Sequence, residues 1–429
     1  MSFRNFLSEL EEKDELIQVN KELSPEFEIP RELNKNEDKA LIFNKIKNHD
    51  MKVAGNICGA RNRIAKALGV EREELIPRLR EAHKNPRKPN KTSTAPIKEN
   101  EIKGKPNLEE LPILTHFEKD GGPYVTSSIL VAKDEDGNQN LSFHRMKYLG
   151  GNKFAVRLVP RNLHKMFSKA EERDEDLSVA AVIGVHPAVS IAAASSPPYG
   201  FDEYSIAGAL LEELELTDCD SLDLEVPAGS EIVLEGKLVS GERAPEGPFA
   251  DITGTYDAVR EEPVFEVDSI MMRSDAIYQA ILPSSTEHQL LMGMPREPLI
   301  FEELEKVVNP NNVRLTPGGG GWLHGVISIK KENKDDGKKA IESALKAHSS
   351  MKHVVIVDND INIYDSREVE WAIATRARAD RDVIIKSNVK GSSLDPTADP
   401  ETRVGSKMGI DATIDLGEPN KFKRAKIPK

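Results

Sequence analysis

The sequence predicts a multidomain α/β protein of the α+β type, in which a strand-rich middle part lies between two parts that mix helices and strands. Its 429 residues are too many for one ordinary hydrophobic core, so two or three domains are expected. Short β-branched runs cluster between about residues 125 and 269, and helical and strand patterns alternate after about residue 298. We predict boundaries that give an N-terminal α/β part with a linker (1–105), a central part (106–300) and a C-terminal α/β part with a tail (301–429).

The first part combines short helices with apolar patches. Helical patterns cover residues 3–12 and 71–83, and the apolar patch at 40–43 predicts a strand. Pro77 predicts a kink or a new helix start within the second pattern. The polar, basic stretch 84–105 contains several prolines and predicts an exposed connector.

Four runs in the middle part are rich in β-branched residues and predict strands. They are VTSSILVA, KFAVRLV, SVAAVIGV and EIVLEGKLV, which begin at residues 125, 153, 178 and 231. Two helices are predicted among them, one after Pro160 and one after Asp202, a residue suited to the N-cap. Strands with inserted helices of this kind suggest a β-barrel or a β-sandwich.

The last part alternates helical runs with strand-like runs, beginning with FEELEKVV and GVISIKK. This alternation predicts a mainly parallel sheet. The run PGGGGW at 317–322 lacks the order of a phosphate-binding loop and predicts a flexible hinge or a tight turn. The basic tail 420–429 is expected to fray.

Charge and cysteine content exclude several classes of protein. A formal net charge of −13 argues against a general binder of nucleic acid or of anionic membranes. Cys58 and Cys219 form no CxxC pair, which favours a reducing compartment. The N-terminus lacks the apolar core of a secretory signal, and no apolar run of about 18 residues occurs. We therefore expect a cytoplasmic protein without a membrane span.

Two carboxylates in the segment APEGPFADITGTY are the first candidates for acid-base chemistry. Glu246 and Asp251 are five residues apart, and Pro245, Gly247 and Pro248 prevent a regular helix between them. They are therefore expected on a shaped loop, where catalytic groups are often held. A surface turn with two solvated acids explains the spacing equally well.

The segment NLSFHRM at 140–146 alternates polar and apolar side chains. If it is extended, Asn140, Ser142 and His144 face one side, and Arg145 lies on the other side with two apolar residues. An arginine in such a place either extends to water or meets an acid such as Glu246, where it would favour the charged form.

Asn140, His164 and Glu203 lie on three predicted elements and offer amide oxygen, imidazole and carboxylate. Such a mixed nitrogen and oxygen set suits manganese or magnesium better than a soft metal. Each of these residues taken alone is unremarkable, so the residues by themselves leave the metal site open.

Several segments together resemble the UbiD family of prenylated-flavin-dependent decarboxylases. They are the NLSFHRM strand, LVPRNLHKMF, AAASSPPYGFDEYSIAGALL, VPAGSEIVLEGKLVSGERAPEGPFADITGTY and GSKMGIDAT, and the likeness extends from about residue 105 to 415. The resemblance implies an N-terminal α/β part, a central split β-barrel of flavin-reductase type and a C-terminal α/β domain used for oligomerisation.

The resemblance also assigns roles to individual residues. The family's catalytic arginine falls on Arg145, and its two acids fall on Glu246 and Asp251. The second acid is glutamate in ferulic acid decarboxylases, so the shorter Asp251 implies that the other acid is the proton donor or that the pocket is tighter. The divalent metal would be held by Asn140, His164 and Glu203. The flavin contacts implied are Asn140, Ser142, Phe143, His144, Arg145, Leu163, His164, Ser195, Ser196, Pro197, Glu203 and Lys346.

The cofactors and partners implied are those of the family. They are prenylated FMN, made by a separate UbiX-type prenyltransferase, and Mn2+ or Mg2+, with K+ as a further candidate. The cofactor would supply the bond-breaking chemistry and the protein the orientation and proton transfer. A homo-oligomer, either a dimer or a hexamer, is expected. An ordinary flavin reductase would need a nicotinamide site, for which the sequence has no fingerprint.

The substrate end of the family's pocket involves residues 322–324 and 392–395, and the second group is small and polar here. A flat aromatic acid is therefore disfavoured. The compact chain resembles the members that convert trans-anhydromevalonate 5-phosphate to isopentenyl phosphate. In this chain Arg157, Arg161 or Lys147 would bind the substrate phosphate, and the alternative for each is a solvated surface charge. The alternatives are a 4-hydroxybenzoate-type or polyprenyl-hydroxybenzoate acid, and a non-catalytic flavin-binding subunit.

Overall fold

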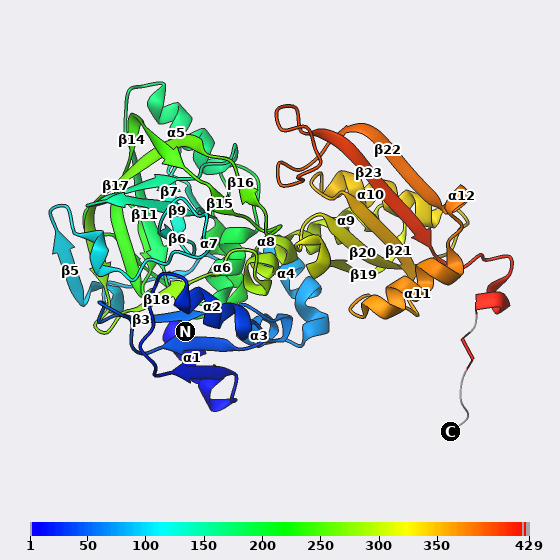
Figure 1. The fold of residues 1–429 in the computed structure, drawn as a ribbon, viewed down its shortest axis with the longest axis horizontal. Helices are drawn as coiled ribbons and strands as arrows, with labels where there is room; N and C mark the ends of the chain where they lie inside the picture. The colour runs from blue at the N-terminus through cyan, green and yellow to red at the C-terminus, as the bar shows by residue number, and fades with distance from the viewer. Residues whose placement is uncertain (1, 423, 426–429) are drawn as a thin grey trace. The chain divides into compact units, whose positions relative to one another are not determined.

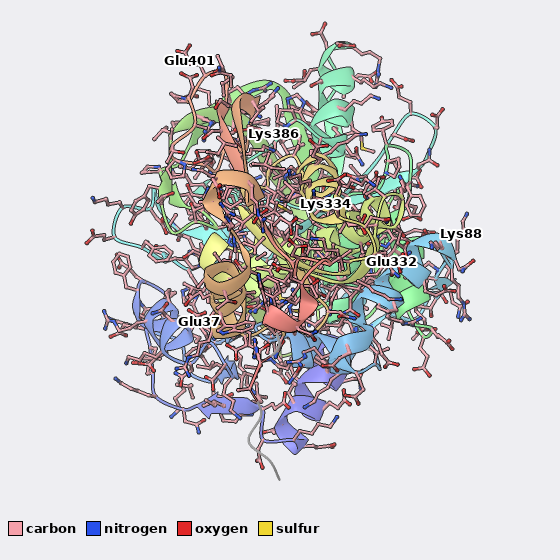
Figure 2. All side chains as sticks on the ribbon, turned by 90° about the vertical axis from the view of Figure 1, so that its right-hand side faces the viewer. Glu37, Lys88, Glu332, Lys334, Lys386 and Glu401 are labelled. Atoms are coloured by element: carbon pink, nitrogen blue, oxygen red, sulfur yellow. The ribbon has the colours of Figure 1, made fainter. Side chains whose placement is uncertain are left out.

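The computed structural model describes residues 2–422 and 424–425, and the chain divides into two compact units, residues 1–291 and 292–429 (Figure 1). Figure 2 labels exposed charged side chains of both units, among them Lys88 in the first and Glu401 in the second. The tail 420–429 was predicted to fray, and its residues 423 and 426–429 lie outside the described ones. Among the helices described, none has both the length and the apolar character needed to cross a membrane.

A small sheet near the N-terminus has the strand order β1-β2-β3-β18. These strands are β1 (Leu16–Val19), β2 (Ala40–Phe43), β3 (Lys52–Gly55) and β18 (Ile277–Ala280). The accompanying helices are α1 (Phe3–Glu12), α2 (Glu28–Lys35), α3 (Arg61–Ala67), η1 (Arg72–Glu74) and α4 (Leu75–Lys84). Helix α1 matches the predicted range, because a capping box of Ser2 and Asn5 fixes its start and its apolar residues recur on one buried face.

The stretch 84–105 is not a free connector, which corrects the expectation from its composition. It contains β4 (Asn90–Lys91), η2 (Pro96–Lys98) and β5 (Asn100–Lys103). Strand β4 pairs with β12 (Glu215–Asp218), and β5 pairs with β17 (Arg260–Met272). The polar side chains face water while the backbone satisfies its hydrogen bonds in two sheets, so composition alone could not predict the pairing.

The central sheet follows the order β6-β9-β10-β17-β14-β11-β7-β8. Its strands besides β17 are β6 (Tyr124–Val125), β7 (Ile129–Lys133), β8 (Gln139–Phe143), β9 (Met146–Gly150), β10 (Lys153–Val156), β11 (Leu177–Ile183) and β14 (Ile232–Glu246). Strand β8 ends the order and β9 stands next to the other end, yet only His144 and Arg145 separate them in the chain. The sheet must therefore curl until its ends meet, which makes a split barrel and places Arg145 at the seam.

Three helices inserted between the strands lie against this seam. They are α5 (Asn162–Glu171), α6 (Pro187–Ala194) and α7 (Glu203–Leu210), whereas α8 (Thr286–Gly293) follows β18. Helices α5, α6 and α7 each contact β8. The sequence predicted α5 and α7, and Asp202 caps α7 by accepting the N–H of Tyr204. Helix α6 was missed, because its small residues are buried on all sides and show no 3.6-residue period.

Short elements complete the first unit. They are η3 (Leu108–Glu110), β13 (Glu225–Pro227), which pairs with β12, and the hairpin of β15 (Phe249–Ala250) and β16 (Tyr256–Asp257). The barrel interior is apolar, and the rings of Phe154 and Phe265 stack there with centroids 6.4 Å apart.

The second unit holds a five-stranded sheet in the order β19-β20-β21-β23-β22. The strands are β19 (Asn309–Leu315), β20 (His324–Lys330), β21 (His353–Asp358), β22 (Val383–Lys390) and β23 (Val404–Ala412). Only the pairs β20–β21 and β21–β23 are parallel, so the prediction of a mainly parallel sheet holds for the centre and is wrong at both edges. Each edge strand is joined to its neighbour by a loop without a crossover helix, which permits only antiparallel pairing.

Helices cover this second sheet and connect its strands. They are η4 (Met294–Arg296), α9 (Glu297–Glu305), η5 (Pro317–Gly319), α10 (Asp336–Ala347), α11 (Ser366–Arg376), α12 (Ala379–Asp382) and η6 (Pro419–Phe422). The glycine run forms the tight turn between β19 and β20, where Gly320 and Gly321 adopt φ values of 65° and 63°. This confirms the turn rather than the hinge.

Candidate active site

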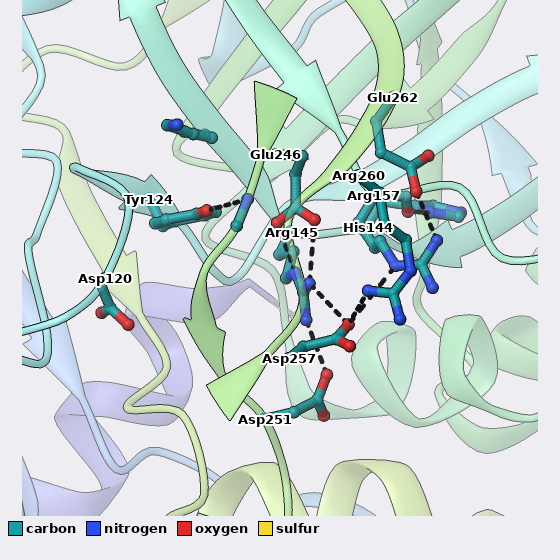
Figure 3. Close-up of polar contacts among 12 residues, drawn as sticks. Asp120, Tyr124, His144, Arg145, Arg157, Glu246, Asp251, Asp257, Arg260 and Glu262 are labelled. Atoms are coloured by element: carbon teal, nitrogen blue, oxygen red, sulfur yellow. Dashed lines mark hydrogen bonds and ion pairs between the residues drawn. The ribbon is translucent and has the colours of Figure 1, made fainter. Parts of the chain in front are cut away.

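Arg145 holds three carboxylates at the seam of the barrel (Figure 3). Its Nε and Nη2 donate to Glu246 at 2.8 and 3.0 Å, its Nη1 donates to Asp251 at 2.7 Å, and its Nη2 also donates to Asp257 at 3.2 Å. Only 9% of the Arg145 side chain and none of the Glu246 side chain is exposed. Burial opposes the charged guanidinium, but the bonds and charges of these acids outweigh it and raise the pKa of Arg145. The predicted convergence of Arg145, Glu246 and Asp251 is therefore present in the structure.

Glu246 lies at the end of the long strand β14, not on a loop, which corrects the expectation drawn from Pro245. In this part of β14 the residues pair with β17 on one side, whereas β11 pairs only as far as Leu238. A proline lacks the N–H needed by a second neighbour, so it is tolerated where the strand is an edge. The irregular part begins only at Gly247.

Asp257 is a third acid that the sequence did not reveal. It is the register partner of Phe249 in the β15–β16 hairpin, which brings it to the Nη2 of Arg145. Arg260 also binds its Oδ2, at 2.6 Å. Burial works against ionisation of Asp257, but the Arg260 bond and the charge of Arg145 hold its pKa below the usual range. The available signal was that Asp257 directly follows the motif APEGPFADITGTY.

The network continues from Asp257 to Arg157, which binds Glu262 at 2.5 Å. Arg145, Arg157 and Arg260 thus face four carboxylates: Glu246, Asp251, Asp257 and Glu262. With every group ionised the sum is one negative charge, and one proton on a carboxylate brings it to zero. A buried cluster of this kind can hold a proton for transfer.

Asn140, Ser142 and His144 share one side of β8, as the alternation predicted. Ser142 Oγ lies 3.3 Å from Asn140 Oδ1 and 3.0 Å from His144 Nε2. His144 Nδ1 lies 2.8 Å from the carbonyl oxygen of Arg157, so Nδ1 carries the proton and Nε2 accepts. Burial lowers the pKa of His144 to about 4, which keeps this imidazole neutral.

Glu203 is a buried carboxylate without a cationic partner in the described part of the chain. Its oxygens accept from Asn140 Nδ2 and from the N–H of Leu141, both at 2.8 Å. Burial raises the pKa of Glu203 to about 8, although the Leu141 N–H acts in the opposite direction. An ionised carboxylate here needs a positive charge, so the site fits a divalent cation.

His164 is exposed in the first turn of α5, and no recorded contact joins it to Asn140 or Glu203. The structure thus brings together two of the three predicted metal ligands. Among the described residues, no three His, Cys, Asp or Glu side chains form a metal cluster, and the predicted set contains only two residues of those types.

The titration of Glu203 gives a testable prediction for the protein without divalent ions. The folded pKa of about 8 lies above the ordinary value of 4.5, so this group's contribution to stability is complete below pH 4.5 and is lost as the pH rises towards 8. The free energy of unfolding should fall by up to ~1.4 kcal/mol per pH unit in this window. Urea unfolding in EDTA at pH 5 and pH 8 measures the loss.

Two comparisons make this test specific. Glu203→Gln should abolish that pH dependence, and Mn2+ should abolish it in the wild type, because the ionised carboxylate is then paired. Equal pH dependence in the wild type and the variant would contradict the assignment.

The other predicted flavin contacts lie around α5 and α6. Leu163 is buried, Phe143 is half-buried on β8, and Ser195 caps α6 with its Oγ bonded to Ala192 O at 2.6 Å. Ser196 has a φ of 57°, and its Oγ lies 3.3 Å from Arg161 Nη1. Pro197 O lies 3.5 Å from the Asn162 side chain. Lys346 is exposed on α10, in the second unit.

The three basic residues considered for a phosphate have different surroundings. Arg157 is committed to Glu262, and Lys147 Nζ donates to Pro245 O at 3.1 Å. Arg161 is exposed and, within the described residues, has a hydrogen bond to Ser196 and no acidic partner. Although part of the side chain is exposed, loss of hydration in the protein lowers the pKa of Arg161. A bound anion would favour the charged guanidinium and offset this effect.

His288 on α8 is a second residue that the sequence did not reveal. Its Nδ1 accepts the N–H of Ser284 at 3.1 Å, which leaves the proton on Nε2. Burial lowers the pKa of His288, the charge of Arg145 acts in the same direction and that of Asp251 in the opposite one, so this neutral imidazole lies near the acid cluster. Glu37 fixes the start of α8 by accepting from Thr286. No local pattern marks His288, because its partners come from distant segments.

Family models match almost the whole chain. The 3-octaprenyl-4-hydroxybenzoate carboxy-lyase N-terminal domain matches residues 7–83, the Rift-related domain matches 88–286 and the C-terminal domain matches 289–412. The chain belongs to the UbiD family.

UbiD relatives match this chain from end to end. The anhydromevalonate phosphate decarboxylase of Methanothermobacter thermautotrophicus is 44% identical over 98% of this chain and 99% of its own. The enzyme of the same name from Methanosarcina mazei is 43% identical over 100% of both.

Solved UbiD structures have the same fold. HmfF from Pelotomaculum thermopropionicum, in complex with FMN, has a TM-score of 0.97 and 42% identity, covering 100% of this chain and 98% of its own. The apo 3,4-dihydroxybenzoic acid decarboxylase of Enterobacter cloacae has a TM-score of 0.93 and 25% identity, covering 100% and 97%. These likenesses confirm the multidomain α/β fold with a split barrel.

Proposed function

We propose that this protein is a prenylated-FMN-dependent carboxy-lyase that removes carbon dioxide from trans-anhydromevalonate 5-phosphate to give isopentenyl phosphate. The binding of Glu246 and Asp251 by Arg145 at the barrel seam carries the proposal, because it supplies a cation for a carboxylate and acids for a proton. The full-length similarity to enzymes named anhydromevalonate phosphate decarboxylase supports this substrate.

Arg145 would orient the substrate carboxylate. A guanidinium has five N–H donors, and four contacts engage them here, two with Glu246 and one each with Asp251 and Asp257. The remaining N–H is on Nη1, beside Asp251. A substrate carboxylate would accept this remaining N–H or take the place of Asp251 on Nη1. In either case the carbon–carbon bond to be broken lies next to Asp251.

Asp251 is the better placed proton donor. Its side chain is 18% exposed, whereas that of Glu246 is fully buried and both its oxygens bind Arg145. Asp251 can therefore recover a proton from solvent after each turnover, while Glu246 holds Arg145 in place. In this assignment Asp251 protonates the carbon from which carbon dioxide has left.

Prenylated FMN, when bound, supplies the electron sink that allows carbon dioxide to leave. The polar side of β8 with Ser142 and His144, and the residues around Ser196, would hold it. HmfF, solved in complex with FMN, supports a flavin as the cofactor. Asn140 and Glu203, with His164, would hold Mn2+ or Mg2+ beside its phosphate, and the uncompensated Glu203 is the observation that favours a metal. K+ is a further candidate ion.

Arg161 would meet a phosphate group, because it lacks an acidic partner within the described residues. This distinguishes the proposed substrate from aromatic acids without phosphate. A UbiX-type prenyltransferase would supply the cofactor, and a homo-oligomer, dimer or hexamer, is proposed, since an evolved form of HmfF is dimeric. The two free, buried cysteines support a reducing, cytoplasmic location.

Carbon dioxide release tests the function directly. Protein produced together with a UbiX-type prenyltransferase should release carbon dioxide from trans-anhydromevalonate 5-phosphate and not from 4-hydroxybenzoate. Release from 4-hydroxybenzoate alone would favour the aromatic alternative. Release from neither, by protein whose absorbance spectrum confirms bound flavin, would leave a non-catalytic flavin-binding subunit as the better reading.

A further inference from the structure

Residues 117–124, here termed the clasp, bind the backbone of residues 247–250, which connect Glu246 to Asp251 and are here termed the connection. Asp120 Oδ1 accepts the N–H of Ala250 at 3.2 Å, and Tyr124 Oη accepts the N–H of Gly247 at 3.0 Å. In the opposite sense, the N–H of Gly121 donates to Pro248 O at 2.8 Å. The clasp thus binds the backbone of three of the four residues between the two acids.

Aromatic packing joins the clasp to Arg145. The Phe249 ring lies 4.6 Å from the Tyr124 ring, and the Arg145 guanidinium lies 4.4 Å from the Phe249 centroid. Figure 3 shows Asp120 and Tyr124 on one side of this connection and Arg145 on the other. Tyr124 is fully buried. The connection therefore lies between the clasp on one side and Arg145, to which Glu246 and Asp251 are bound, on the other.

Asp120 has surroundings unlike those of an ordinary surface acid. It has no ion-pair partner within the described residues, and its Oδ2 accepts the N–H of Phe117 at 2.9 Å. Burial raises the pKa of Asp120, while backbone N–H groups and the charge of Arg145 act in the opposite direction. Asp120 therefore lies near the acid cluster but accepts hydrogen bonds from backbone N–H groups. This is how a residue that supports the geometry of a site is bonded.

We propose that Asp120 and Tyr124 are positioning residues, which fix Glu246 and Asp251 relative to Arg145 through the backbone of residues 247–250. This inference rests on the proposed function. The connection needs such support because Gly247 has a φ of 97° and Pro248 has no N–H, so the segment cannot complete a regular strand. The β15–β16 hairpin secures only its far end.

Gly121 shows how closely the clasp and the connection fit. A Cβ atom at this position would lie 2.2 Å from Gly247 O and 2.8 Å from Gly247 C, which are backbone atoms and cannot move aside as a side chain can. The φ of Gly121 is not in the left-handed region, so alanine would be acceptable to its own backbone. Gly121→Ala should therefore displace Gly247, the neighbour of Glu246. Gly318→Ala is the matched control, because its Cβ would meet nothing within 4 Å.

Turnover measures the effect of the clasp on the acids. Asp120→Ala and Gly121→Ala should lower kcat roughly 10- to 100-fold, since a misplacement of about 1 Å has this effect on positioned groups. Tyr124→Phe leaves the buried Gly247 N–H without an acceptor and should lower kcat about tenfold. Asp120→Asn keeps one acceptor oxygen, which can serve the N–H of Ala250, and loses the bond from Phe117, so its kcat should fall less than that of Asp120→Ala. Substrate KM should change much less than kcat, and the flavin spectrum should stay unchanged in all four.

Hydrogen exchange gives a readout that needs no turnover. Asp120→Ala should accelerate exchange in a peptide covering 246–257, whereas Gly318→Ala should not. If the wild type has no activity on the proposed substrate, exchange still tests the clasp, and the two failures remain distinguishable. The proposal would be overturned if folded, flavin-loaded Asp120→Ala and Tyr124→Phe had the kcat and pH profile of the wild type. Unchanged hydrogen exchange of the peptide 246–257 in Asp120→Ala would overturn it as well.

Discussion

Asp251→Asn is expected to lower kcat by about three orders of magnitude, with flavin binding unchanged. An amide of the same shape keeps a hydrogen bond from Arg145 Nη1 but cannot give a proton to carbon, and general acid catalysis contributes roughly 10²- to 10⁴-fold. Binding of the substrate carboxylate should persist, so KM should change much less than kcat. Steady-state decarboxylation by flavin-loaded protein measures both constants.

Two comparisons separate proton donation from a general loss of charge. Glu261→Gln is the matched control, because Glu261 is exposed on β17 beside the same part of β14. Its kcat should equal that of the wild type. Glu246→Gln should also lower kcat, but by loosening Arg145, so it should raise KM as well. Wild-type kcat in Asp251→Asn with a depressed kcat in Glu246→Gln would transfer the role of donor to Glu246.

Local patterns predicted the parts of this site that lie on one element. Alternation along β8 placed Asn140, Ser142 and His144 on one side, because side chains in a strand have a period of two. The cap at Asp202 placed Glu203 at the start of α7. These predictions needed only neighbouring residues, whose geometry the backbone itself sets.

Contacts between distant segments could not be predicted in this way. Asp257 reaches Arg145 through the register of β15 and β16, and His288 lies near Asp251 because Glu37 anchors α8. Glu246 was assigned to a loop because the residues around it prevent a regular helix, whereas its place on a strand depended on β14 being an edge there. Sequence patterns report the local preference, whereas strand order and register depend on the whole fold.

Arg145→Met is expected to have the largest effect on stability. It removes the guanidinium that three carboxylates share, of which Glu246 is fully buried. Leaving buried charges without their partner typically costs about 3–5 kcal/mol, so the free energy of unfolding at pH 8 should fall by about that amount. Activity should be lost as well, because within the described residues Arg145 alone is bound to both Glu246 and Asp251. Urea unfolding and turnover check the two effects, with the exposed Arg378→Met, expected within about 0.5 kcal/mol of the wild type, as control.

The pH dependence of that loss distinguishes an electrostatic cause from a packing defect. Without Arg145 the ionised acids repel one another, and protonation of one of them at lower pH relieves that repulsion. The deficit of Arg145→Met should therefore be smaller at pH 5 than at pH 8. Adding Glu246→Gln removes one of the repelling charges and should restore part of the stability at pH 8. A deficit that is the same at both pH values, and that Glu246→Gln deepens, would mean that Arg145 acts through its packing on Phe249 and not as the counter-ion of the acids.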